Sequence, residues 1–171
     1  MGYYAEREDK MLIEMKVKFL TFDPSSNGFV VFLVDGENKH ALPIWIGPFE
    51  ANAIALKLKK STPNRPLTHD LIRSFIDALN CKISHVVVND LKENTYYGLI
   101  YIEAKKGELV IDSRPSDAIA IALGAGAPIF VEEDVLHRTK SAVLDKEGRE
   151  LPDRLKEWME TLTPEDFEGK A

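Results

Sequence analysis

The amino-acid sequence predicts an α+β fold in which two duplicated βββα units form a mixed or antiparallel sheet that packs on helices. The first observation is a helix without a polar side, because every side chain from Ala118 to Leu123 is apolar and such a helix must be buried. The second is a related segment: residues 48–56 (PFEANAIAL) match residues 115–123 (PSDAIAIAL) at an offset of 67 residues. The third is that similar strand and turn patterns precede both helices without a gap, which indicates an internal duplication.

Each predicted unit consists of three strands and a helix. Runs of β-branched and large apolar residues, separated by turns such as Asp23-Pro24-Ser25-Ser26-Asn27-Gly28, predict the strands. In the first unit they cover residues 11–22, 29–34 and 40–46, and in the second residues 82–92, 95–105 and 108–112. Pro48 is suited to the first position of the first helix, where its missing N–H costs nothing. That helix runs to about Lys60, and the fully apolar one stops at Gly124.

The remaining segments complete the α+β pattern. Thr68 is a suitable N-cap for a second amphipathic helix, whose expected buried face consists of Leu71, Ile72, Phe75, Ile76 and Leu79. A short strand is expected at residues 128–131 and a helical turn at 132–137. A final amphipathic helix is predicted from the apolar stripe of Leu151, Leu155, Trp158, Met159 and Leu162. We therefore expect one domain over residues 1–137, followed by a charged linker and helix over residues 138–171.

Composition and charge restrict the function classes. Of 171 residues, 22 are Lys or Arg and 28 are Asp or Glu, so the net charge of −6 excludes an overall basic surface, and any nucleic-acid contact must be local. Cys81 is the only cysteine, which excludes an intrachain disulfide and a thiolate metal cluster. Neither a membrane-length apolar run nor a signal-type N-terminus is evident. We expect a cytoplasmic protein without membrane association. We also expect a homodimer, because sheet edges are usually covered, formed either edge to edge or through the helix predicted at Leu151–Leu162.

The residues able to carry chemistry gather where strands or loops meet helices. Residues 65–70 (RPLTHD) open one helix and residues 112–117 (DSRPSD) open the apolar one, while Glu50 is the counterpart of Asp117 in the first unit. Converging carboxylates can hold Mg²⁺ or Mn²⁺, a histidine can transfer a proton, and arginines can bind phosphate oxygens through two hydrogen bonds. Such a set suits metal-assisted hydrolysis of phosphodiesters.

We therefore predict a site with four kinds of contributor. The catalytic candidates are Glu50, His69, Asp70, Asp112 and Asp117; the phosphate-binding candidates are Arg65 and Arg114; the supporting residues are Thr68 and Ser116; and the metal ligands are Asp70, Asp112 and Asp117. A structural interpretation competes with this one. In it, hydroxyls cap helices, aspartates oppose helix dipoles, and each arginine bridges a nearby carboxylate without catalysis.

Three segments resemble the bifunctional nuclease domain family: LPIWIGPFEANAIAL (42–56), NRPLTHDL (64–71) and IDSRPSDAIAIALGAGAPIFV (111–131). The resemblance covers roughly residues 11–137 and implies activity on both RNA and DNA, with nucleic acid as the substrate and no organic cofactor. It places the polar positions of the family on the candidate residues named above. The alternative is a non-catalytic regulatory or assembly module that shares the fold, and the acidic net charge favours it mildly.

Overall fold

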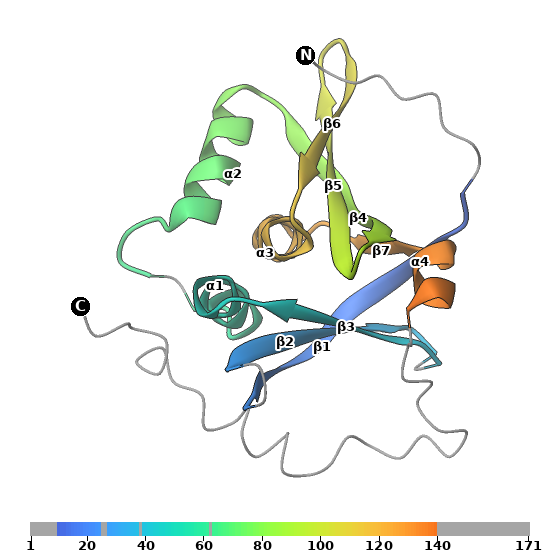
Figure 1. The fold of residues 1–171 in the computed structure, drawn as a ribbon. Helices are drawn as coiled ribbons and strands as arrows, with labels where there is room; N and C mark the ends of the chain where they lie inside the picture. The colour runs from blue at the N-terminus through green and yellow to red at the C-terminus, as the bar shows by residue number, and fades with distance from the viewer. Residues whose placement is uncertain (1–9, 25–26, 38, 62, 140–171) are drawn as a thin grey trace.

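The computed structural model describes residues 10–24, 27–37, 39–61 and 63–139. Their elements are β1 (Leu12–Asp23), β2 (Gly28–Asp35), β3 (Ala41–Ile46), α1 (Pro48–Leu58), α2 (Thr68–Ala78), β4 (Lys82–Lys92), β5 (Thr95–Ala104), β6 (Gly107–Ser113), α3 (Pro115–Ala125), β7 (Ile129–Glu132) and α4 (Glu133–Arg138). The strands form one seven-stranded mixed sheet in the order β3-β2-β1-β7-β4-β5-β6. The predicted α+β fold is confirmed (Figure 1).

The sheet consists of two antiparallel meanders joined by β7. Strands β1, β2 and β3 pair in sequence, as do β4, β5 and β6, and each meander leads into a helix, α1 or α3. Between the meanders, β7 runs antiparallel to β1 and parallel to β4. The two units therefore share the same internal pairing, although the corresponding strands β1 and β4 run in opposite directions in the sheet. The duplication itself stays a prediction.

The apolar helix α3 lies at the centre of the molecule. It contacts α1, α2, β4 and β5, and Figure 1 shows α1 and α3 side by side between the two meanders. Its side chains from Ala118 to Ala122 are buried, as the sequence predicts for a helix without a polar side. The start of α3 lies against β5 because Gly98 has no side chain: a Cβ there would be 3.2 Å from both N and Cα of Pro115. This contact fixes the N-terminal end of α3, where the candidate site lies.

We expect Ala122→Leu to destabilise the fold by about 1–3 kcal/mol, because extra methylenes in a closely packed core force neighbouring atoms apart. Ala122 is fully buried on α3, and α1 presents the small buried residues Ala51 and Ala55 to the core. Urea denaturation measures the loss. Ala125→Leu is the matched control, since Ala125 is exposed at the end of the same helix. Equal stability of the two variants would contradict a tight contact at residue 122.

Helix α2 forms at the predicted residues but differs from the prediction in two ways. It has no fully buried residue. Leu71, Ile72, Phe75 and Leu79 are exposed, so their expected burial is wrong, whereas Ile76 is partly buried and packs against the core. Thr68 is the first helical residue, and its neighbour Leu67 occupies the N-cap position. The expected capping role of Thr68 is therefore wrong too.

Other sequence predictions concern segments at the ends of the chain. The amphipathic helix expected at Leu151–Leu162, within the predicted tail of residues 138–171, lies outside the described residues and stays a prediction. Among the described residues, no helix combines the length and the apolar character needed to cross a bilayer. The expected homodimer stays a prediction as well.

Candidate active site

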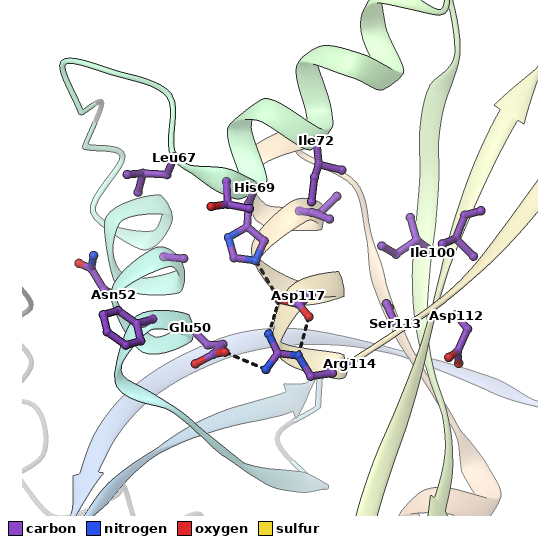
Figure 2. Close-up of a pocket in the computed structure, with 15 residues that line it drawn as sticks. Glu50, Asn52, Leu67, His69, Ile72, Ile100, Asp112, Ser113, Arg114 and Asp117 are labelled. Atoms are coloured by element: carbon purple, nitrogen blue, oxygen red, sulfur yellow. Dashed lines mark hydrogen bonds and ion pairs between the residues drawn. The ribbon is translucent and has the colours of Figure 1, made fainter.

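A pocket of about 680 Å³ opens where the N-terminal ends of α1, α2 and α3 approach β5 and β6. Its polar lining includes His69, Arg114 and Asp117, which Figure 2 shows next to one another. The complete lining comprises Phe49, Glu50, Asn52, Ala53, Leu67, Thr68, His69, Ile72, Ile100, Ile111, Asp112, Ser113, Arg114, Asp117 and Ile121. The lining thus combines apolar side chains with a charged group of Glu50, His69, Arg114 and Asp117, here called the charged wall.

Asp117 is the centre of the charged wall. It is the third residue of α3, where a carboxylate opposes the positive end of the helix dipole. Arg114, which precedes the helix, donates from Nε to Asp117 Oδ2 at 2.7 Å and from its terminal NH₂ to Oδ1 at 3.1 Å. Both carboxylate oxygens of Asp117 are therefore engaged by one guanidinium group, in the two-pronged arrangement that such pairs favour.

His69 reaches the same carboxylate from α2. Its Nε2 lies 3.0 Å from Asp117 Oδ1, and because a carboxylate only accepts hydrogen bonds, Nε2 carries the donated proton. Partial burial of Asp117 raises the pKa of its carboxyl group. Hydrogen bonds from Arg114 and His69 together lower it by more, so the net pKa is below the ordinary value. Asp117 is therefore ionised at neutral pH, and it fixes the orientation of the imidazole ring.

Glu50 completes the charged wall from α1. Its Oε1 forms an ion pair with Arg114 at 2.9 Å, so the guanidinium links the N-terminal ends of α1 and α3. The carboxylate fits here because residue 47 is glycine: a Cβ at Gly47 would be only 2.5 Å from Glu50 Oε2. Glu50 and Asp117 are both third residues of their helices, as their alignment at an offset of 67 residues predicts.

Arg114 remains accessible despite these contacts. Its side chain is 67% exposed, whereas those of Glu50, His69 and Asp117 are 17%, 14% and 27% exposed. Contacts with Asp117, and more weakly with Glu50, raise the pKa of the guanidinium above its already high value. Each terminal nitrogen carries two N–H groups and makes one of the contacts described here, so donors remain for a ligand. Arg114 is thus held in place yet open to the pocket.

Asp70 contacts the beginning of α2 and helix α1. Its Oδ1 pairs with Lys57 of α1, and its Oδ2 accepts a hydrogen bond from the backbone N–H of Leu67 at 3.2 Å. Burial raises the pKa of Asp70, but these contacts lower it to a net value below the ordinary one. Asp70 therefore fastens the beginning of α2 to α1 and positions the adjacent His69.

The other predicted site residues lie outside this cluster. Arg65 is exposed in the loop before α2 and does not line the pocket. Asp112 lines the pocket from β6, but Figure 2 shows its carboxylate apart from Arg114 and Asp117. Thr68 is exposed at the pocket, whereas Ser116 is buried within the first turn of α3.

The predicted metal ligands are not gathered. Asp70 is occupied by Lys57, and Asp112 lies apart from Asp117. Within the described ranges, no three His, Cys, Asp or Glu side chains are placed so that they could hold a metal ion. The residues present therefore do not fit the predicted ligand set, although the requirement for Mg²⁺ or Mn²⁺ stays a prediction.

Two residues at or next to the site were not among the candidates predicted from the sequence. Lys57 was not among the candidate residues, yet its side chain is only 14% exposed where it pairs with Asp70. The available signal was a single cation between Leu56 and Leu58 in an otherwise apolar stretch. Phe49 is strongly exposed at the pocket and sits directly before Glu50, so its place in the first turn was the only indication.

Comparisons with known proteins agree with the motifs in the sequence. The family model of the bifunctional nuclease domain matches residues 31–143, which include all of the pocket residues. Two curated Mycobacterium tuberculosis proteins, uncharacterized protein MT1877 (strain CDC 1551 / Oshkosh) and uncharacterized protein Rv1829 (strain ATCC 25618 / H37Rv), are each 36% identical to this chain over 164 residues. Each alignment covers 91% of this chain and 98% of the relative.

Proposed function

Because the chain belongs to the bifunctional nuclease domain family, we propose that it hydrolyses phosphodiester bonds of RNA, DNA or both in the pocket between α1, α2 and α3. The observation that carries this proposal is the row formed by His69, Asp117 and Arg114. It joins an oriented imidazole to an accessible guanidinium through one ionised carboxylate. A group that transfers protons and a group that binds phosphate are thus neighbours.

Arg114 supplies the phosphate-binding part of the mechanism. Asp117 and Glu50 hold the guanidinium from two sides, so little reorganisation is needed when a phosphate oxygen approaches its free N–H groups. Fixed donors of this kind stabilise the negative charge that develops on the phosphoryl oxygens in the transition state.

His69 supplies the proton transfer. With the Nε2 proton donated to Asp117, Nδ1 is the nitrogen left to accept a proton from the attacking oxygen. Asp117 stabilises the imidazolium that then forms, and Lys57 and Asp70 hold the beginning of α2 so that His69 stays in reach. Every group in this scheme belongs to the chain itself.

The second candidate function is a non-catalytic assembly module. Its specific support is that Arg114 is paired with two carboxylates that lie on different helices, which would also serve to join α1 to α3. The net charge of −6 favours it as well, because extended nucleic-acid binding depends on neutralising phosphates.

Asp117→Asn separates the two functions. We expect purified protein to cleave labelled single-stranded RNA or DNA, and Asp117→Asn to lower the rate by about tenfold or more, since the neutral side chain no longer stabilises a charged imidazole. Rates are measured with added Mg²⁺, with added Mn²⁺ and with a chelator, which also tests the metal requirement. Asp77→Asn is the matched control, because Asp77 is exposed on α2 and outside the pocket.

The outcomes are distinct. Cleavage that is lost in Asp117→Asn and kept in Asp77→Asn supports the nuclease. Wild-type protein without cleavage under all three conditions contradicts the nuclease and leaves the assembly module. Cleavage that is unchanged in Asp117→Asn contradicts the roles assigned to Asp117 and His69 in that cleavage.

A further inference from the structure

Helix α2 turns three polar side chains toward the protein, next to the partly buried Ile76. Asp70 pairs with Lys57 of α1, His69 donates to Asp117 of α3, and the guanidinium of Arg73 donates to the backbone oxygen of Gly124 at the end of α3. These residues lie on one side of the helix at intervals of one to four positions. An amphipathic helix on a globular protein ordinarily shows the reverse arrangement.

Four apolar side chains on α2 and at its C-terminal end face outward. The exposed fractions are 50% for Leu71, 38% for Ile72, 62% for Phe75 and 72% for Leu79. This outer face of α2 continues onto the edge strand β6, where Ile111 is exposed and lines the same pocket as Ile72. A contiguous apolar surface of this kind on a protein ordinarily marks a contact site. We therefore expect another segment to cover the outer face of α2, which consists of Leu71, Ile72, Phe75 and Leu79.

A second apolar stripe in the same chain is available to cover it. Residues Leu151, Leu155, Trp158, Met159 and Leu162 recur at helical spacing in the segment beyond the described residues. We propose that residues 151–162 of the same chain pack against the outer face of α2. Each stripe then shields the other from water, which neither can achieve alone.

The length of the connecting chain fits this contact. The described part ends at Thr139, next to Arg138, which donates to the backbone oxygen of Leu91 at the end of β4 at 2.8 Å. Helix α2 leads into the beginning of the same strand, whose eleven residues span about 36 Å. Residues 140–150 can span up to about 36–40 Å when extended. The segment can therefore start near the far end of β4 and reach α2.

Tryptophan fluorescence of the full-length chain tests the proposal. The chain has two tryptophans, and Trp45 is exposed on β3, so Trp45→Phe leaves Trp158 as the sole reporter. We expect blue-shifted emission and weak acrylamide quenching of Trp158 in this background. Adding Phe75→Asp should shift the emission toward that of the urea-unfolded protein and raise the quenching constant several-fold. Phe22→Asp is the matched control, because Phe22 is exposed on β1, away from α2.

Each result decides the proposal. A Trp158 signal that changes with Phe75→Asp but not with Phe22→Asp, at constant molecular mass by light scattering and with unchanged circular dichroism, supports it. Emission already typical of unfolded protein in the Trp45→Phe background overturns it, as does a buried Trp158 that is insensitive to Phe75→Asp. A dimer that Phe75→Asp dissociates also overturns it, since the occupant of α2 would then be a second copy.

Discussion

Replacing His69 by alanine is expected to lower phosphodiester hydrolysis by about 10²–10⁴-fold, the usual contribution of a positioned acid or base. The reason is geometric. His69 is the histidine that lines the pocket, and its Nε2 is fixed by Asp117 at 3.0 Å. Steady-state rates on the better of the RNA and DNA substrates measure the effect. Substrate affinity should change less than the rate, because Arg114 remains in place to bind phosphate.

Rescue by imidazole distinguishes proton transfer by His69 from a purely structural role, which added imidazole would not restore. Added imidazole should restore part of the activity of His69→Ala, because the space left by the side chain is next to Asp117 and a free imidazole can accept the proton there. His137→Ala is the matched control, since His137 is exposed on α4. The lowered pKa of Asp117 keeps that carboxylate ionised from neutral to mildly acidic pH. Titration of Asp117 therefore does not account for a loss of activity as the pH falls through this range. Activity of His69→Ala equal to that of His137→Ala would remove His69 from the mechanism.

Most of the fold could be predicted because its signals are local. The strand predicted at residues 82–92 is β4 to the residue, since β-branched residues and flanking turns report directly on backbone conformation. The strand expected at residues 128–131 and the helical turn expected at 132–137 are β7 and α4, each displaced by one residue. Local signals do not reveal that β7 inserts between β1 and β4, because that pairing depends on contacts between distant segments.

The candidate site could be predicted only in part, for a related reason. Periodicity shows which residues of α2 share a face, but not which face meets the rest of the protein. That choice depends on polar partners far along the chain, such as Asp117 for His69 and Lys57 for Asp70. The pairing of Asp70 with Lys57, which holds the beginning of α2 against α1, is non-local in the same way. Glu50, Arg114 and Asp117 lie together in the structure; the sequence alignment placed the two acids at equivalent helix positions but could not show that one arginine pairs with both.

The largest loss of stability is expected from shortening the side chains of α3. Ile119→Ala and Ile121→Ala should each destabilise the protein by about 2–5 kcal/mol, the range for removing buried aliphatic groups and leaving a cavity. Both side chains are buried, although two residues along a helix correspond to a rotation of about 200°. An ordinary amphipathic helix would bury only one of them. Such a loss is a large fraction of the typical stability of a domain.

Urea denaturation at neutral pH measures these losses, with the dependence on urea concentration checked for equality so that the midpoints can be compared. Leu12→Ala is the control, because Leu12 is an aliphatic residue of β1 that is partly exposed, and its truncation should cost less than either substitution on α3. If only one of the two isoleucine variants were strongly destabilised, α3 would have an open side. The helix would then no longer be the buried centre around which α1, α2 and the two meanders pack, and the fixed position of Asp117 would need another explanation.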